Sequence, residues 1–200
     1  MRRFIVLGQK ARASPDFLLS DIPSTSGRLD VLLHAMRAAL LVSHGVRTDT
    51  IVYLVLLGEP AQVRTVRVDG SAARYLRPDE RSMATTLKKA FCAPCAETGF
   101  APVRPGICVA RGAIDAMHAD ITGSRLYLLD AAGTDVRSCG FDQPAQTFVL
   151  GDHLGIGDEQ RNGWLAAGAR PLSVGPRQLH TQDVIALVAN ELDRRATVSS

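Results

Sequence analysis

The chain has 200 residues, of which 46% are hydrophobic and 22% are charged, and its formal net charge is +3. These values are close to the average of globular domains. They exclude a disordered chain, which would bury too little apolar surface to offset its conformational entropy. The longest strongly apolar run, residues 51–57, is far shorter than the roughly 20 residues of a membrane-spanning helix. We expect a single domain, residues 1–200, in the cytoplasm, because no signal-peptide pattern is visible.

Arginine dominates the basic residues. Of the 23 lysines and arginines only three are lysines, Lys10, Lys88 and Lys89. The planar guanidinium group suits bidentate contacts with phosphate, so the composition permits a nucleic-acid-binding surface. A genome whose base composition favours arginine codons explains the same bias equally well.

The first part of the chain begins with a predicted strand at residues 4–7, where a short apolar run ends at a glycine. A polar stretch, residues 9–26, follows and is expected to be irregular. Leucines at helical spacing predict a helix over residues 29–41, which Gly45 stops. The continuous apolar run 51–57 is typical of a strand covered on both faces, as in a parallel sheet.

The middle of the chain continues the alternation. Residues 63–68 alternate Val or Thr with Arg, as a half-exposed strand does. A proline followed by acids starts a helix over residues 78–90. The Pro/Gly-rich stretch 92–105 is expected to be irregular, before a short strand at 106–109 and a short helix at 114–119.

The last part completes an α/β pattern. Residues 125–129 form a predicted strand, which residues 130–133 turn, and further strands and helices follow at residues 147–150, 158–167, 171–174 and 184–195. Strands that alternate with helices predict an α/β fold with a mostly parallel sheet.

The four cysteines give a weak metal signal. Cys92 and Cys95 form a CxxC pair, whereas Cys108 and Cys139 stand alone. A zinc site would need a second close pair, and a redox centre would open a helix rather than follow one. Reduced thiols and no bound metal are therefore expected, with a CxxC zinc or redox module as the least favoured alternative.

Three late strands end in polar or glycine-containing loops, at residues 128–130, 151–155 and 172–176. In an open α/β sheet, ligands bind beyond the carboxyl ends of the strands, and glycine lets the backbone approach them closely. Three such loops indicate a pocket whose main-chain groups bind adenine and ribose, although each could be only a tight turn. GxGxxG, the phosphate loop, GxSxG and HExxH are all absent, which disfavours nicotinamide enzymes, NTPases and hydrolases.

Several segments, in order, resemble one known family. They are Gly27–Leu32, Val52–Gly58, Tyr75–Ser82, Phe148–Gly155 and Asn190–Arg195. Together they are similar to the TrmY family, the tRNA pseudouridine N1-methyltransferases of archaea with relatives in some bacteria, which belong to the SPOUT superfamily. The similarity covers nearly the whole chain.

The resemblance implies a SPOUT-type, Rossmann-like α/β fold with helices on both faces, a C-terminal trefoil knot and a homodimer. It implies S-adenosylmethionine as cofactor and the pseudouridine of the tRNA T-loop, or another structured RNA, as substrate. The implied cofactor contacts are Leu128, Leu129, Gly151, Asp152, His153, Leu154, Leu172, Ser173, Val174, Gly175, Pro176, Leu179 and Val184. The archaeal pattern has a cysteine before isoleucine where this chain has Val184-Ile185, which removes one possible contact.

Methyl transfer from a sulfonium is an in-line displacement, so the enzyme must mainly align its reactants. The N1–H of pseudouridine is weakly acidic, and a carboxylate is expected to accept its proton. Asp30 is the first candidate and Asp79 or Glu80 the second, while helix capping or the helix dipole explains these acids without catalysis. Arg28 and Arg81 are expected to stabilise charge on the uracil carbonyls. Phosphate contacts are predicted for Arg2, Arg3, Arg12, Arg74 and Arg77.

A function from another class remains open. A knotted RNA-binding or assembly protein would keep the cofactor pocket and the RNA contacts but would lack catalysis. Binding of the cofactor without a methylated product would distinguish it from the enzyme.

Overall fold

The computed structural model describes residues 1–96, 98–112 and 115–198. Its main sheet has the strand order β10-β8-β9-β1-β4-β5-β7-β6. The five strands from β10 to β4 are parallel to their neighbours, and β5, β7 and β6 extend the sheet in antiparallel fashion. The bounds of these strands are β1 Arg2–Gly8, β4 Thr50–Leu56, β5 Arg64–Asp69, β6 Ala101–Arg104, β7 Ile107–Arg111, β8 Arg125–Asp135, β9 Gln146–Gly151 and β10 Arg170–Ser173.

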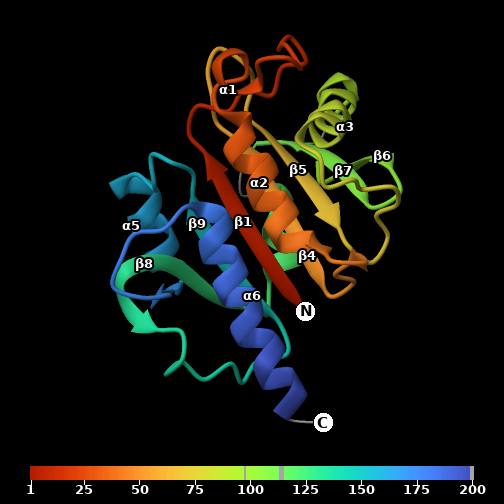
Figure 1. Cartoon of the computed structure of the whole chain (residues 1–200). Helices are drawn as coiled ribbons and strands as arrows, with labels where there is room; N and C mark the ends of the chain where they lie inside the picture. The colour runs from red at the N-terminus through yellow and green to blue at the C-terminus, as the bar shows by residue number, and fades with distance from the viewer. Residues whose placement is uncertain (97, 113–114, 199–200) are drawn as a thin grey trace.

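Helices cover both faces of the sheet, as expected (Figure 1). The larger apolar cluster lies between one face and the helices α2, α3 and α6, and the smaller one lies between the other face and α4 and α5. Figure 1 shows α2 and α6 side by side in front of β1. The bounds of the helices are α1 Ile22–Thr25, α2 Leu29–Leu40, α3 Glu80–Cys92, α4 Asp115–Ile121, α5 Asp158–Ala166 and α6 Thr181–Val198.

An aromatic row fixes the register at the centre of the larger cluster. Phe4, Phe148 and Tyr127 occupy matching positions on β1, β9 and β8. Their ring centroids are 5.4 Å and 5.3 Å apart, within the range of favourable aromatic pairs. Because side chains alternate across a strand, a slip of one residue would move this whole row to the other face.

Most predicted elements are present, but three expectations about irregular segments are wrong. The chain does not turn at residues 130–133, because β8 continues to Asp135 and pairs with β10 through Thr134 and Asp135. Residues 92–105 contain β6, which pairs with β7 despite Pro102. Residues 9–26 contain the short helix α1.

Smaller differences concern the ends of elements. Helix α2 ends at Leu40, before a two-stranded ribbon of β2 Leu41–Val42 and β3 Gly45–Val46. Helix α6 begins at Thr181 rather than Val184. The predicted helix 114–119 corresponds to α4, and its first position lies outside the described residues.

Candidate active site

The carboxyl ends of β1 and β9 form the topological switch point of the sheet. After β1 the chain crosses to β4 through α2 on one face, whereas after β9 it crosses to β10 through α5 on the other face. Connections that leave two neighbouring strands in opposite directions open a crevice between them, and ligands of α/β proteins bind there. Two of the three predicted loops, those after β9 and β10, lie at this edge.

Asp152 fixes the loop that follows β9. Its side chain is fully buried, and its carboxylate accepts hydrogen bonds from the backbone N–H of Gln9 (2.8 Å) and of Leu154 (2.9 Å). Its own N–H donates to the carbonyl of Leu7. Buried carboxylates of this kind stabilise a loop through charge-assisted hydrogen bonds. The Asp152 carboxylate therefore acts inside the protein, where it holds the loop to the end of β1.

Two further side chains connect this loop to other elements. Gln9 Nε2 donates to the carbonyl of Gly155 (3.2 Å) and to Oε1 of Gln160 (2.7 Å). Thr181, the first residue of α6, donates its hydroxyl to the carbonyl of Gly151 (2.8 Å). The loop after β9 is thus joined to β1, α5 and α6.

The glycines at this edge have different roles. A Cβ on Gly151 would overlap the backbone of Gly155, so Gly151 permits the tight turn itself. A Cβ on Gly133 would overlap the backbone of Leu172, so Gly133 lets β8 approach β10. Gly155 and Gly175, in contrast, have positive φ and open space where a Cβ would stand.

The structure brings the predicted cofactor residues of β8 and β10 together on neighbouring strands. Leu128 and Leu172 are buried in the core, and the hydroxyl of Ser173 bonds the backbone of Gly175. The remaining apolar members are half-buried or exposed around the loops: Leu129, Val174 and Val184 pack against the larger cluster, and Leu154 and Leu179 are 53% and 44% exposed.

An ion pair joins strand β8 to α5. Arg161 donates to Oδ2 of Asp130 at 2.8 Å. The pKa of Asp130 is lowered, first by the backbone N–H of Ala132 and then by Arg161. This contact holds the start of α5 beside the predicted pocket.

Arg28 and Asp30 form the predicted catalytic pair, and they contact each other directly. Arg28 Nε and Nη2 each lie 3.0 Å from an oxygen of Asp30. The Asp30 side chain is only 10% exposed, whereas that of Arg28 is 44% exposed. The pKa of Arg28 is raised, first by the hydrogen bond to Asp30, and the charge of Asp152 acts in the same direction. The guanidinium thus faces solvent. Gly27, the residue before Arg28, meets the backbone of Lys10, which follows the Gln9 that binds the loop after β9.

The backbone around this pair is unusual. Gly27 and Arg28 both have positive φ, of 72° and 68°, although such a conformation is uncommon for a residue with a side chain. The hydroxyl of Ser26, rather than Asp30, accepts the N–H of Leu29 at the start of α2. The capping explanation of Asp30 is therefore wrong, and strained backbone is typical of functional sites.

The other candidate catalytic residues, Asp79, Glu80 and Arg81, lie at the start of α3. Asp79 is exposed, accepts the N–H of Ser82 (2.8 Å) and caps α3, and this hydrogen bond lowers its pKa. Helix α3 packs against β7 and α2, on the side of the sheet away from β8 and β10 (Figure 1). The structure therefore places Asp79, Glu80 and Arg81 away from the loops after β9 and β10.

The arginines predicted to contact phosphate differ in how far they are buried. The prediction for Arg2 is wrong, because its side chain is buried and paired with Asp49 (3.0 Å) and Asp193 (2.6 Å) at the amino end of β1. Arg3 follows at the same end of the strand and is half-buried. Arg74 and Arg77 are exposed in the loop between β5 and α3.

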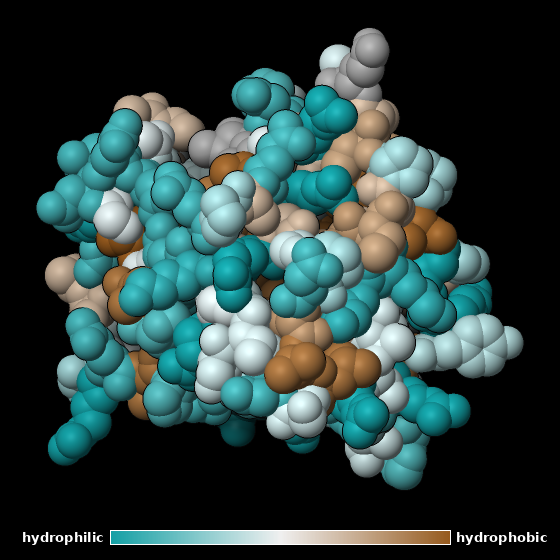
Figure 2. Space-filling view, turned by 90° about the horizontal axis from the view of Figure 1, so that it is seen from above, coloured by the Kyte–Doolittle hydropathy of each residue, from teal (hydrophilic) through white to brown (hydrophobic). Residues whose placement is uncertain are grey.

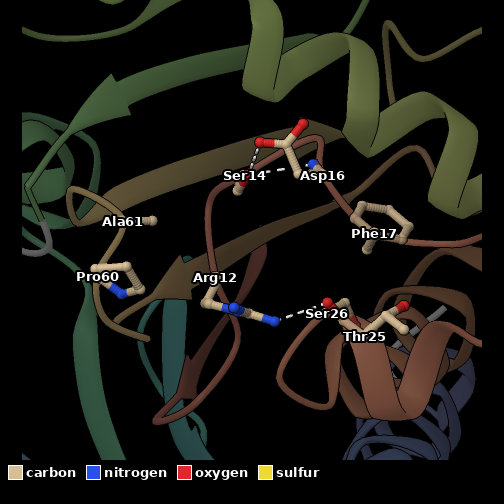
Figure 3. Close-up of a pocket in the computed structure, with 8 residues that line it drawn as sticks. All are labelled: Arg12, Ser14, Asp16, Phe17, Thr25, Ser26, Pro60 and Ala61. Atoms are coloured by element: carbon tan, nitrogen blue, oxygen red, sulfur yellow. Dashed lines mark hydrogen bonds between the residues drawn. The ribbon is translucent and has the colours of Figure 1, made fainter.

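Two hollows lie at the carboxyl ends of β1 and β4. Arg12, a predicted phosphate contact, lines both, and the other side chains around it were not predicted. The first hollow, of about 310 Å³, is lined by Arg12, Ser14, Asp16, Phe17, Thr25, Ser26, Pro60 and Ala61 (Figure 3). The second hollow, of about 450 Å³, is lined by Gln9, Lys10, Arg12, Ser24, Gly27, Leu57, Gly58 and Glu59. Polar residues directly after the first two predicted strands were the available signal, but only the late strands were considered.

The cysteines are free in the structure. Within residues 1–96, 98–112 and 115–198, no group of His, Cys, Asp and Glu side chains is arranged to hold a metal ion. The same residues contain no helix that is long and apolar enough to cross a membrane.

Comparison with a solved structure identifies the fold. The crystal structure of Archaeoglobus fulgidus Nep1 bound to S-adenosylhomocysteine matches 98% of this chain and 99% of its own, with a TM-score of 0.66 and 14% identity. The chain has the α/β fold of the SPOUT methyltransferases.

Sequence comparison identifies the family. The profile described as "Putative SAM-dependent RNA methyltransferase" matches residues 1–197. The Methanosarcina acetivorans tRNA (pseudouridine(54)-N(1))-methyltransferase is 39% identical over 97% of this chain and 92% of its own. The Halobacterium salinarum protein of the same name is 37% identical over 96% of each chain. The chain belongs to this family of S-adenosylmethionine-dependent RNA methyltransferases.

The residues at the edge of the sheet fit S-adenosylmethionine. Adenosine sites combine apolar walls with a few backbone or side-chain polar groups. Leu154 and Leu179 expose apolar side chains here, and open space lies in front of the backbone at Gly155 and Gly175.

Proposed function

We propose that the chain methylates N1 of the pseudouridine at position 54 of tRNA, the activity by which its curated relatives are named. The observation that carries the proposal is the exposed guanidinium of Arg28, which Asp30 holds beside the loop after β9. Family membership supports the reaction type, and 35–39% identity over nearly the whole chain supports the substrate.

We assign the cofactor to residues 128–130 of β8 and to the loops after β9 and β10. Leu129, Leu154, Val174 and Leu179 would form the apolar walls, and the backbone of residues 151–155 and 172–176 would bind the polar groups. S-adenosylmethionine, when bound, supplies an electrophilic methyl group on a sulfonium. The chain's own task is then to hold the acceptor base in line with that group.

Arg28 is placed to stabilise the negative charge that develops on a uracil carbonyl as N1–H loses its proton. Both oxygens of Asp30 accept hydrogen bonds from Arg28, so the carboxylate is already engaged in holding the guanidinium. We therefore assign Asp30 the positioning of Arg28 ahead of the role of general base.

The wider setting follows the family resemblance. We propose a homodimer with a C-terminal trefoil knot that acts on tRNA in the cytoplasm. The position of β8 between β9 and β10 supports the knot. The largely hydrophilic surface seen from above, with only small separate apolar patches, suits a polar partner such as RNA (Figure 2).

The test is incubation with S-adenosylmethionine and two T-arm hairpins, one with pseudouridine and one with uridine at the target. Mass spectrometry of the nucleosides should find one added methyl group on pseudouridine only. Cofactor binding without any product would contradict the proposal and favour an RNA-binding protein without catalysis.

A further inference from the structure

The second hollow has a rigid floor. A Cβ on Gly27 or on Gly58 would overlap the carbonyl oxygen of Lys10, so three chain segments meet there in backbone contact. Gly58 N–H donates to Ala11 (2.9 Å), and Arg12 N–H donates to Ser26 (3.1 Å). A site built from such contacts is formed before its ligand binds, which reduces the entropic cost of binding.

The side chains of the hollow carry both charges. Lys10 and Glu59 are exposed at its rim. Arg12, which lines both hollows, donates to the carbonyl of Thr25 (2.7 Å), and this hydrogen bond fixes its guanidinium (Figure 3). Fixed cations bind phosphate, and a carboxylate accepts hydrogen bonds from the N–H groups of a base edge. The volume of about 450 Å³ lies within the range of small-ligand sites.

The position of the hollow indicates which part of an RNA would reach it. One wall of the hollow, Gln9, contacts the loop after β9. The opposite wall, Gly58 and Glu59 after β4, lies two strands from the end of β9, and adjacent strands are about 4.8 Å apart, so a base at Glu59 is roughly 10 Å from that strand end. Successive stacked nucleotides of one strand are only about 3.4 Å apart along the axis. A nucleotide in the hollow must therefore leave the stack, as bases of single-stranded loops do when proteins bind them.

We propose that the second hollow binds one nucleotide of the substrate RNA that adjoins the methylated one, splayed out of the stack. Its phosphate lies on Lys10 and Arg12, and the N–H groups of its base face Glu59. This inference rests on the proposed function for the choice of RNA, and it assigns a sequence-reading role to a hollow that adjoins the methyl-transfer crevice at Gln9.

The experiment measures the affinity of T-arm hairpins in which each loop nucleotide in turn is made abasic. The wild-type protein should lose at least about tenfold in affinity at one position beside the target, because the hydrogen bonds between that base and the charged Glu59 are lost. Glu59→Ala should bind the intact hairpin more weakly, but should lose little more with that abasic hairpin. The inference would be overturned if the affinity losses from Glu59→Ala and from the abasic nucleotide were additive. It would also be overturned if the largest affinity loss occurred at the methylated position itself.

A matched pair of lysines controls for general charge. Lys10→Met should weaken every hairpin several-fold and reduce the salt dependence of binding, whereas Lys89→Met, on exposed α3, should change affinity less than twofold. Equal effects would contradict the site. Methylation of the same hairpins is measured in parallel. If no methyl group is added but the affinity losses of Glu59→Ala and the abasic hairpin are not additive, only the proposed function is overturned. If methylation is normal but the two affinity losses are additive, only the nucleotide site is overturned.

Discussion

Gln9 and Gly155, 146 positions apart in the chain, are joined by a hydrogen bond of 3.2 Å from the side-chain amide to the carbonyl. The contact connects the end of β1, which lines the second hollow, with the loop proposed to bind the cofactor. Gln9→Ala should raise the Kd for S-adenosylhomocysteine about three- to tenfold, because each lost hydrogen bond costs about 0.5–1.5 kcal/mol. Isothermal titration measures it, with exposed Gln143→Ala as control. An unchanged Kd would show that the loop does not depend on Gln9.

Thr181→Val tests the connection between α6 and the same loop. The substitution preserves shape but leaves the carbonyl of Gly151 without its hydroxyl partner, so the free energy of unfolding should fall by about 1–3 kcal/mol. Urea denaturation measures this change. Thr85→Val is the control, since that hydroxyl bonds only its own helix at Arg81, and its effect should stay below about 0.5 kcal/mol. Equal losses in the two variants would contradict the assignment.

Asp30→Asn tests the ion pair with Arg28. If Asp30 positions the guanidinium, turnover should fall at least about tenfold while S-adenosylhomocysteine affinity is retained, and the pH profile of kcat/KM should keep its shape. Asp158→Asn, an exposed acid in the first turn of α5, should leave turnover unchanged. Loss of the acidic limb of the profile in Asp30→Asn would instead make Asp30 the general base, and unchanged turnover would remove it from the site.

Gly151→Ala tests the turn after β9. The new Cβ would overlap the backbone of Gly155, so the loop must open, and both stability and cofactor affinity should fall. Gly163→Ala in α5 meets no neighbouring atom and should instead stabilise by about 0.5–1 kcal/mol. Thermal unfolding of both variants provides the comparison. A Gly151→Ala protein with normal stability and affinity would refute the close approach.

Asp193 predicts a pH dependence of stability. Burial raises its pKa, but hydrogen bonds from Arg47 and Arg2 outweigh burial, so the net pKa is lowered. Because the folded pKa lies below the unfolded one, this contribution is present above about pH 4 and is lost as the pH falls through the folded pKa. Asp193→Asn should therefore reduce the loss of unfolding free energy on acidification. Asp183→Asn, exposed on the same helix, should leave the pH dependence as it is, and identical curves for Asp193→Asn and wild type would contradict the assignment.

Local sequence patterns predicted the strands and helices whose burial is continuous. The apolar runs at 4–7, 51–57 and 147–150 correspond to β1, β4 and β9, in which almost every residue is buried. In such strands the apolar run by itself indicates where the strand lies in the sequence. The polar first turn of α6 was missed because its three residues carry no apolar periodicity.

The missed strands depend on distant contacts. The end of β8 is recognisable only from its pairing with β10, which comes about 40 positions later and needs Gly133 for the close approach. β6 contains Pro102, and proline in a short segment indicates a loop unless a neighbouring strand is known.

Only those parts of the site that have a local sequence signal could be predicted. Glycine-containing ends of late strands and the resemblance selected the three loops. Asp30 and Arg28 were selected by the chemistry of methyl transfer, which needs a carboxylate for the proton and a cation for the uracil carbonyls. The roles of Gln9, Asp152 and Thr181 depend on hydrogen bonds between segments far apart in sequence, which no local pattern encodes. The burial of Arg2 likewise follows from its partners Asp49 and Asp193 rather than from its own neighbours.

A crystal structure of the protein with S-adenosylhomocysteine tests the central claim most directly. The account predicts the adenosine between the apolar side chains of Leu129, Leu154, Val174 and Leu179, with the sulfur atom facing the guanidinium of Arg28. Binding in the hollows beside Lys10 and Arg12, or loops after β9 and β10 that remain without the compound at saturating concentration, would contradict it.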